Sequence, residues 1–280
     1  MFRMSDVLLD AQVAAAFGVK REAKALPGTE GRTYRTGNVV LRSGVEKTGL
    51  LWKIEVLRHL QGDGFRVERP IRAHDDRWVV DGWTAWTFLE GRAATPADAA
   101  VVSHGTQALH EALAPLAYAH HLTEEAGLAD REAWGDDPLP MQQPEQIDTS
   151  LRKLTALRRP VTGLRDQVIH GDLNYHNILI APGQAPGFID FSPYWRPSEF
   201  AAAIAAYWLG PYQGDTAMLH HFAQVRELEQ MLVRVAIRQL RRLVEADGLE
   251  YAEEFTQAAD VVCQLIDQSP KRHPLPGSRC

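Results

Sequence analysis

One stretch of eight residues limits the possible folds of this chain more than any other feature. It reads His-Gly-Asp-Leu-Asn-Tyr-His-Asn at positions 170–177, between apolar runs at 168–169 and 178–180, and a third apolar segment ends at Asp190. Short apolar runs bounded by polar and turn-forming residues are typical of buried strands. The sequence therefore predicts short strands that present polar side chains at their ends.

The polar residues of this stretch have the spacing of a phosphoryl-transfer site. Asn177 follows Asp172 by five positions, and Asp190 follows Asn177 by thirteen. In a kinase, the first Asp accepts the proton of the acceptor hydroxyl, and the Asn and the second Asp bind Mg²⁺ through the oxygen ligands that this cation prefers. A Gly-Asp turn alone would indicate only a loop. The combination favours Asp172 as the catalytic base and Asn177 and Asp190 as magnesium ligands.

Through these motifs the chain resembles the aminoglycoside phosphotransferase and choline kinase-like superfamily. Its members carry His-Gly-Asp with an Asn five residues after the Asp, and a metal motif that reads Ile189-Asp190-Phe191 here. The resemblance implies an α+β fold of the two-lobed, protein-kinase-like type, with a small antiparallel-sheet N-terminal lobe of five strands and one main helix, and a larger helical C-terminal lobe. It also implies ATP- and Mg²⁺-dependent transfer to a hydroxyl of a small molecule, such as an antibiotic, an amino-sugar or another metabolite.

The same resemblance implies where the nucleotide binds. Phe88 and Leu89 would lie on the hinge that meets adenine through backbone groups. Thr33 belongs to the segment 28–37, which would cover the phosphates although it lacks the full Gly-x-Gly-x-x-Gly pattern. Arg42 stands where the family usually has a Lys for the α- and β-phosphates. An Arg can also neutralise phosphate, although it is a planar fork and Lys is a point charge.

The carboxylate partner of Arg42 stays open at this point. The family pairs the strand lysine with a Glu on the next helix, but Lys53 stands near that position, with Glu55 and Glu46 as nearby candidates. A catalytically degenerate kinase-fold protein that binds nucleotide or a partner without transfer is therefore the alternative function. The presence of all three chemically required residues favours catalysis. A protein kinase is disfavoured because no Ala-Pro-Glu segment follows Asp190.

The sequence before residue 90 has the patterns of a small sheet with helices. Apolar residues at helical spacing predict helices over 5–17 and 50–60. Turn residues at Gly37-Asn38 and Asp81-Gly82 each stand between extended runs, and Asp-Gly is strongly favoured in tight hairpins. These patterns predict two hairpins, the second of which joins residues 78–80 to the strand that begins at Trp83.

The remaining chain is mainly helical in pattern. Residues 99–128 and 222–243 are predicted to be helical, and the proline-rich segment 134–146 is predicted to be a loop. We therefore expect a nucleotide-binding lobe at 1–88 and a helical lobe with the catalytic loop and acceptor site at 89–280. The arginines of segment 222–243 are predicted to form a solvated face: Arg226, Arg234, Arg238, Arg241 and Arg242.

Histidine and aromatic residues outside the motif receive structural interpretations. Trp195 either borders the acceptor pocket or packs against the helical lobe, and Tyr207 and Trp208 are predicted to be core residues. No carboxylate or cysteine stands at zinc-like spacing from the histidines, and adjacent histidines cannot share one helix face. The following are therefore predicted to be core or surface residues and not metal ligands: His104, His110, His120, His121 and His176.

The composition narrows the class of partner. A net charge of −6 argues against general nucleic-acid binding and permits a cationic substrate. No apolar run approaches the roughly 18 residues of a membrane span, and the N-terminal sequence lacks the pattern of a secretory signal, so we expect a cytoplasmic protein without membrane contact. Two cysteines cannot form a disulfide framework. The acceptor, the choice between ATP and GTP, and the oligomeric state are not determined by the sequence.

Overall fold

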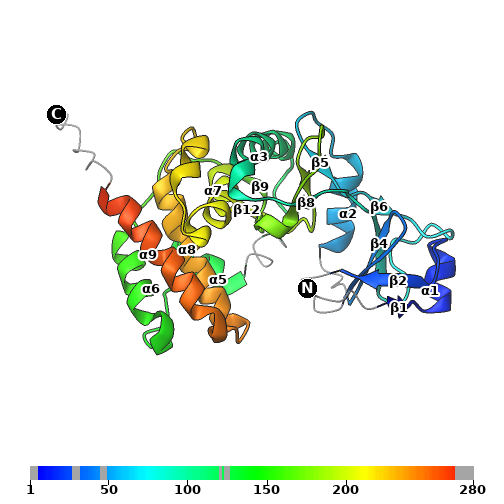
Figure 1. The fold of residues 1–280 in the computed structure, drawn as a ribbon, viewed down its shortest axis with the longest axis horizontal. Helices are drawn as coiled ribbons and strands as arrows, with labels where there is room; N and C mark the ends of the chain where they lie inside the picture. Colours follow the sequence, from blue (N-terminus) through cyan, green and yellow to red (C-terminus); the bar gives the residue numbers. More distant parts are fainter. Residues whose placement is uncertain (1–5, 27–31, 45–48, 120–121, 123–126, 269–280) are drawn as a thin grey trace.

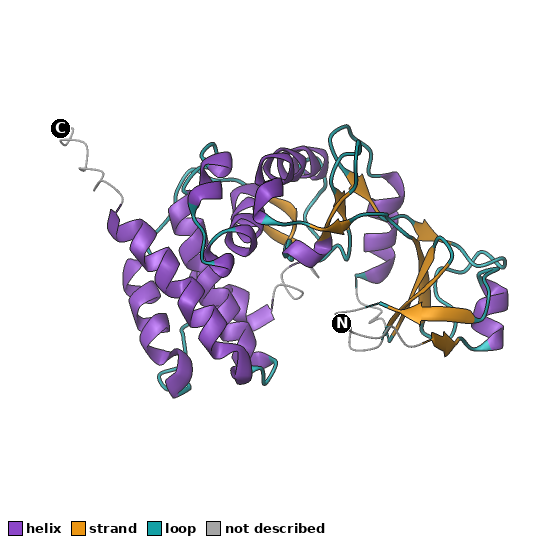
Figure 2. Cartoon of the chain, in the orientation of Figure 1, coloured by secondary structure: helices purple, strands orange, loops and turns teal. Residues whose placement is uncertain are grey.

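The computed structural model describes residues 6–26, 32–44, 49–119, 122 and 127–268. Its N-terminal part is a sheet with two helices, and its C-terminal part is mainly helical (Figures 1 and 2). Some residues discussed above lie outside the described ranges: Glu46, His120, His121 and positions 28–31 of the segment 28–37.

A six-stranded antiparallel sheet organises the N-terminal part. The order of its strands is β1-β2-β3-β4-β7-β6, so β4 lies near the middle, between β3 and β7. The two hairpin strands around Gly37-Asn38 are confirmed as β3 and β4, and the predicted helix at 50–60 is confirmed as α2. The elements are β1 (Asp6–Leu8), α1 (Ala11–Ala16), β2 (Glu22–Ala25), β3 (Thr33–Thr36), β4 (Val39–Ser43), α2 (Leu50–His59), β6 (Pro70–Ile71) and β7 (Trp83–Thr87).

The two faces of β4 pack against different cores. Val40 lies in the main core together with Ile54 of α2, whereas Leu41 packs in a second cluster with Val13 of α1. Side chains alternate between the faces of a strand. Arg42, two positions after Val40, therefore points to the same side of the sheet as α2 does, and this placement brings it to the space between the two parts.

The first predicted helix is wrong over its N-terminal half. Residues 6–8 form strand β1, in which Val7 is the register partner of Ala23. Helix α1 begins only after Asp10, whose Oδ1 accepts a hydrogen bond from the Gln12 N–H at 2.7 Å. An Asp at this position satisfies an unpaired N–H of the first helical turn. The resemblance implied a sheet of five strands. The sheet has six, because residues 6–8 add the strand β1.

The predicted hairpin at Asp81-Gly82 is wrong in its first strand. The turn itself is present, with positive φ angles of 48° and 79°, as such turns require. Residues 78–79 are not in a strand, and Val80 makes a single bridge with Trp83. The reason is that β7 already pairs with β4 on one side and with β6 on the other.

Two smaller sheets carry the catalytic-loop motif. The predicted strands around it are confirmed: β9 (Asp166–His170), β10 (Ile178–Ile180) and β11 (Gly187–Phe188). One sheet has the order β5-β11-β10-β8, with β5 (Arg66–Val67) and β8 (Arg92–Ala93) at its edges, and the other pairs β9 with β12 (Pro193–Pro197). Strand β5 precedes residue 88 yet pairs with β11. The expected boundary between two lobes at residue 88 therefore stays a proposal, because the sheet of the catalytic-loop motif contains a strand from before that residue.

The helices of the C-terminal part lie mostly on the side of these small sheets that faces away from the N-terminal sheet (Figure 1). The segment predicted as helical at 99–128 is divided, because α3 ends at Leu113 and α5 begins at Gly127, and the loop predicted from 134 begins after Trp134. The helix predicted from 222 begins at Leu228. The helices are α3 (Ala99–Leu113), α5 (Gly127–Trp134), α6 (Glu145–Leu157), α7 (Ser198–Leu209), α8 (Leu228–Glu245) and α9 (Ala252–Gln268).

The arginines of α8 do not form a solvated face, and that prediction is wrong for three of them. Arg234, Arg238 and Arg241 are buried, because α8 is packed against α5, α6, α7 and α9, and every residue from Gln230 to Arg241 is buried. Nε of Arg241 donates to Glu132 at 2.7 Å, and Nη2 of Arg238 donates to the hydroxyl of Tyr194 at 2.9 Å. Buried charges need such partners.

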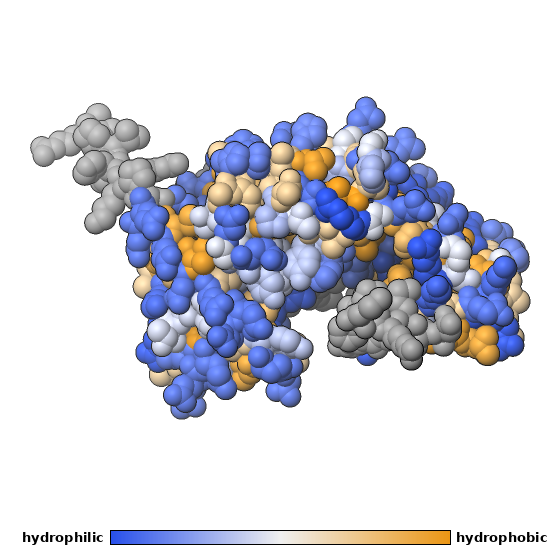
Figure 3. All heavy atoms as spheres, in the orientation of Figure 1, coloured by the Kyte–Doolittle hydropathy of each residue, from blue (hydrophilic) through white to orange (hydrophobic). Residues whose placement is uncertain are grey.

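The face of the molecule in Figure 3 is mostly hydrophilic, with small hydrophobic patches that are scattered and not joined. Most large apolar side chains lie instead in the main core, which extends from Val40 of the sheet to Val262 of α9. Within the described part of the chain, no helix combines the length and hydrophobicity that crossing a bilayer requires.

Candidate active site

A cleft of about 720 Å³ lies between the sheet and the helical part. It brings together all seven residues that the sequence assigned to a site. These are Thr33, Arg42, Phe88, Leu89, Asp172, Asn177 and Asp190. Their joint presence in one cleft follows from the fold, since β3, β4, β7 and the loops after β9 and β11 all end there.

The loop after β9 is held in shape by its own polar side chains. Oδ1 of Asn174 accepts hydrogen bonds from the N–H groups of His176 (2.9 Å) and Asn177 (3.3 Å) and so caps a short 3₁₀ helix at Tyr175–Asn177. Nδ2 of Asn177 donates to the carbonyl oxygen of Asp172 at 2.9 Å and lies 3.3 Å from its Oδ2. Asn177 therefore orients Asp172 through its nitrogen and keeps its Oδ1 for another ligand.

Two buried histidines support this loop from behind. Nδ1 of His170 accepts the N–H of Asp172 at 3.3 Å, so its Nε2 carries the proton and donates to the carbonyl of Ile189 at 3.1 Å. Nε2 of His110 in turn accepts the N–H of His170 at 3.1 Å. Burial lowers the pKa of His170, and it lowers that of His110 to about 4. Both rings are therefore neutral near pH 7 and connect the two loops that carry Asp172 and Asp190.

Gly171 fits here because the loop passes directly over an aromatic ring. A Cβ atom at this position would lie 2.3 Å from Cδ2 of Tyr194, closer than side chains approach one another in proteins. Tyr194 is buried and is held by Arg238 through its hydroxyl. The glycine of the His-Gly-Asp motif thus allows the catalytic loop to pack on β12.

Asp190 sits in a strained, charged position at the end of β11. Its φ angle is +56°, a conformation that Asp adopts more readily than most residues. Burial alone would raise its pKa, but the charges of Arg42 and Lys53 and the nearby His170 lower it further than burial raises it. The carboxylate is therefore ionised in the cleft, as a cation ligand must be.

Arg42 is paired with a carboxylate that the sequence interpretation missed. Its Nη1 and Nη2 donate to Oε1 and Oε2 of Glu68 at 2.9 and 2.8 Å, a bidentate pair. Glu68 is only 2% exposed and follows β5 directly. The candidate Glu55 points to solvent and pairs with Arg58 and His59. The expectation of a helical Glu is therefore wrong for Glu55, and Glu46 lies outside the described residues.

Glu68 escaped detection because no sequence pattern marks it. It stands in a polar Glu-Arg pair between two very short strands, 26 residues after Arg42 in the chain. The only available signal was that Glu68 precedes Pro70, where the chain re-enters the sheet beside β7. Pairing across such a distance is decided by strand order, which the sequence did not reveal.

The hinge residues lie in the cleft, but one backbone group is already used. The N–H of Phe88 donates to the carbonyl of Asn38 at 2.8 Å, and the guanidinium of Arg35 lies over its ring at 3.4 Å from the centroid. A nucleotide base would therefore need other backbone groups, such as those of Leu89. Thr33 is the register partner of Arg42, so β3 forms part of the roof.

An aromatic wall completes the helical side of the cleft. It consists of Tyr175, Trp208 and Tyr212, and the rings of Trp208 and Tyr212 lie 4.4 Å apart. Tyr207 is buried as predicted, but the core prediction for Trp208 is only partly right, because this ring is half-buried and lines the cleft.

The guanidinium of Arg242 lies beside the candidate catalytic base, with its Nη1 3.3 Å from Oδ1 of Asp172. Neither this contact nor the aromatic wall was expected from the sequence.

Trp195 does not line this cleft. Its ring contacts that of Tyr118 edge to face, with centroids 5.2 Å apart, and it packs against the main core. Of the two interpretations, packing against the helical part is the one that the structure supports. Its neighbour Arg196 is bound by Asp130 and Asp136.

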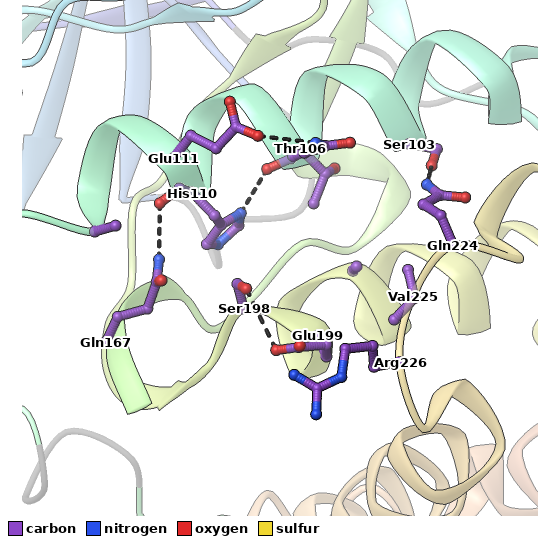
Figure 4. A pocket seen from close by; sticks show the side chains of 13 residues that line it. Ser103, Thr106, His110, Glu111, Gln167, Ser198, Glu199, Gln224, Val225 and Arg226 are labelled. Atoms are coloured by element: carbon purple, nitrogen blue, oxygen red, sulfur yellow. Dashed lines mark hydrogen bonds between the residues drawn. The ribbon is translucent and has the colours of Figure 1, made fainter. Parts of the chain in front are cut away.

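A second cavity of about 410 Å³ lies behind the catalytic loop, between α3 and the start of α7 (Figure 4). Thr106 and His110 line it from α3, and Ser198 and Glu199 line it from α7. It contains none of the seven assigned residues. His110 is the connection between the two spaces, because its ring also accepts the N–H of His170.

The oxygen donors in the main cleft suit Mg²⁺ together with phosphate. Oδ1 of Asn177 and the ionised carboxylate of Asp190 are hard ligands, and Mg²⁺ usually takes only one or two carboxylates besides phosphate oxygens and water. No group of three or more His, Cys, Asp or Glu residues able to hold a metal occurs in the described part of the chain. The residues thus fit a cation that arrives with a nucleotide.

Comparison with known proteins agrees with this geometry. The profile of the phosphotransferase enzyme family matches residues 26–194. No curated protein sequence matches the chain. Among solved structures, spectinomycin phosphotransferase APH(9)-Ia, in complex with ADP and spectinomycin, has a TM-score of 0.58 at 12% identity, covering 92% of this chain and 97% of that one.

Two further structures are similar. Amicoumacin kinase hAmiN, in complex with AMP-PNP, Ca²⁺ and Ami, has a TM-score of 0.60 at 14% identity, and the match covers 91% of each chain. Choline kinase LicA from Streptococcus pneumoniae has a TM-score of 0.51 at 10% identity, covering 87% of this chain and 93% of that one. At these identities the likeness establishes the fold, and the predicted two-lobed, kinase-like α+β architecture is confirmed.

Proposed function

Since this chain belongs to the phosphotransferase enzyme family, we propose that it transfers the γ-phosphoryl group of ATP to a hydroxyl group of a small molecule, with Mg²⁺ as cofactor. The observation that carries the proposal is the arrangement of Asp172, Asn177 and Asp190 in one cleft, with Asn177 bonded to Asp172 through its nitrogen. A cytoplasmic location, where ATP is available, is part of the proposal.

The residues divide the work of the reaction as follows. The carboxylate of Asp172 accepts the proton of the acceptor hydroxyl while the oxygen of that hydroxyl forms a bond to the γ-phosphorus of ATP. The bond between the γ-phosphorus and the β,γ-bridging oxygen breaks, and ADP is released. Asn177 and Asp190 hold Mg²⁺, which when bound neutralises charge on the phosphates. The N-terminal sheet, with Thr33 and the hinge at Phe88 and Leu89, covers the nucleotide.

The acceptor is proposed to bind on the helical side of the cleft. Asp172 must reach the reacting hydroxyl, and the aromatic wall of Tyr175, Trp208 and Tyr212 lines the same space. Aromatic faces favour apolar rings and cations. A small molecule with a hydroxyl next to an apolar or cationic face would suit this wall.

One screen tests the proposal. The protein is incubated with Mg²⁺, ATP or GTP, and a panel of aminoglycosides, peptide antibiotics, nucleosides, amino-sugars and choline, and ADP or GDP release is measured. Acceptor-dependent release that Asp172→Asn abolishes is the expected result. A ligand of the native state raises the melting temperature. If millimolar nucleotide with Mg²⁺ changes neither melting nor release, the proposal is wrong.

A nucleotide-binding protein without transferase activity is the second candidate. It is favoured by one observation, that both terminal nitrogens of Arg42 are bound to Glu68, which reduces their ability to clamp phosphate. Under this alternative, nucleotide would raise the melting temperature while no acceptor in the panel gave release. The three motif residues are more readily explained by catalysis.

A further inference from the structure

Two cations in the cleft share one aromatic ring. Cζ of Arg42 lies 5.5 Å from the centroid of a Trp86 ring, and Nζ of Lys53 lies 5.8 Å from it. Trp86 is buried on β7, and its Nε1 donates to Thr84. The ring is therefore a fixed reference point, and the two positive groups lie in the same region of the cleft although one comes from the sheet and the other from α2.

Arg42 is committed to a structural pair. Both of its Nη atoms donate to Glu68, and its side chain is 15% exposed. Oε1 of Glu68 also accepts the N–H of Asp190 at 2.8 Å. The guanidinium is thus fixed on a carboxylate that cancels its charge and that holds the loop of Asp190. To bind phosphate with both nitrogens, it would have to leave a buried carboxylate unpaired, which is costly.

Lys53 is placed to act on the phosphates. It follows Leu50 by one helical turn, and both residues line the cleft. Its Nζ lies 5.8 Å from the centroid of a Trp86 ring, and Asp190, the proposed Mg²⁺ ligand, lines the same cleft. Lysine is a compact point charge on a flexible four-carbon stem, which lets it follow a phosphate without a fixed geometry.

We infer that Lys53, projecting from α2, is the residue that binds the α- and β-phosphates of the nucleotide, and that Arg42 is a positioning residue that holds Glu68 and the loop of Asp190. This inference rests on the proposed function and adds a residue to it. The positive charge that the family resemblance places on the strand comes from the helix in this chain. Lys53 stands on α2 near the position at which the resemblance places a Glu, and here this position provides the side chain that binds phosphate.

The test compares nucleotides that differ only in their phosphates. Binding of adenosine, AMP, ADP and ATP, with Mg²⁺ present, is measured by calorimetry or competition for the wild type and for Lys53→Met. The wild type should bind ATP more tightly than adenosine. Lys53→Met should weaken ATP binding by about ten- to a hundredfold, the scale of a hydrogen bond to a charged group, and leave adenosine binding unchanged.

Control variants distinguish the effect of losing the charge of Lys53 from the effect of destabilising the folded protein. Lys53→Arg keeps a cation and should retain most of the ATP affinity, and Lys20→Met, at an exposed loop position, should behave as wild type. All variants should melt within a few degrees of one another without ligand. The inference is overturned if the preference for ATP over adenosine is the same in Lys53→Met as in wild type. If the wild type binds no nucleotide, the proposed function fails as well.

Discussion

The carboxylate of Glu68 accepts the backbone N–H of Asp190 at 2.8 Å, although the two residues are 122 positions apart in the chain. This bond joins the segment after β5 to the loop after β11, next to the parallel pairing of Gly187 with Arg66 in the same sheet. The candidate metal ligand is thus fixed by a residue that the catalytic motif does not contain.

Removing Glu68 should destabilise the protein. Glu68→Ala leaves the guanidinium of Arg42 buried without its partner, and breaking such a pair costs about 3 kcal/mol. Urea unfolding should show this loss. Glu55→Ala, on the exposed side of α2, is the matched control and should change the free energy of unfolding by less than about 0.5 kcal/mol. The double variant Arg42→Met with Glu68→Leu should lose less than Glu68→Ala, and equal losses would contradict a paired role.

The two aspartates should fail in different ways. Asp172→Asn removes the proton acceptor but keeps the size of the side chain, so turnover should fall roughly 10²- to 10⁴-fold while Mg·ATP still raises the melting temperature. Asp190→Asn removes the ionised ligand and should weaken Mg·ATP binding together with turnover. Calorimetric titration of both variants checks the assignment. Equal loss of nucleotide affinity in both variants would contradict the assignment of separate roles to the two carboxylates.

Stability should fall on mild acidification because of His110. Burial lowers the pKa of this ring from 6.5 to about 4, so below pH 6.5 the unfolded chain binds a proton that the folded chain refuses. The stabilisation is complete above pH 6.5 and is lost between pH 6.5 and about 4, by at most about 3 kcal/mol. His110→Gln should reduce this dependence in unfolding curves at several pH values, and His170, whose pKa burial also lowers, should account for a remaining part. A flat profile in the wild type would contradict the prediction.

Gly171→Ala should damage the loop through a clash with Tyr194. The added methyl would meet the buried ring at 2.3 Å, and a shift of the loop to avoid it costs about 1 to 3 kcal/mol. Both the melting temperature and the turnover should fall. Gly248→Ala is the control, because a Cβ there would meet its nearest atoms at 3.7 Å, an ordinary contact. Full activity in Gly171→Ala would show that the close packing on β12 is not needed.

The local parts of the site could be predicted from the sequence because their interactions are local. The turn from His170 to Asn177 is held by bonds between residues two to five positions apart, so its spacing is visible in the chain. Helix α2 and the strands β3 and β4 were visible for the same reason, since periodicity and turn residues act over a few positions. Even here the cap at Asp10 was missed, and the first helix was predicted too long.

What the sequence determined by itself was therefore the spacing of the candidate site motif, most element types and the two-lobed fold that the family motif implies. Only the tertiary structure decided which distant residues meet. Strand order placed Glu68 beside Arg42, the central position of α8 buried Arg234, Arg238 and Arg241, and the end of that helix brought Arg242 to Asp172. A charged side chain has the same appearance in the sequence whether it is solvated or buried. Its role depends on what the other elements bring to it, and that is set by packing between segments far apart in the chain.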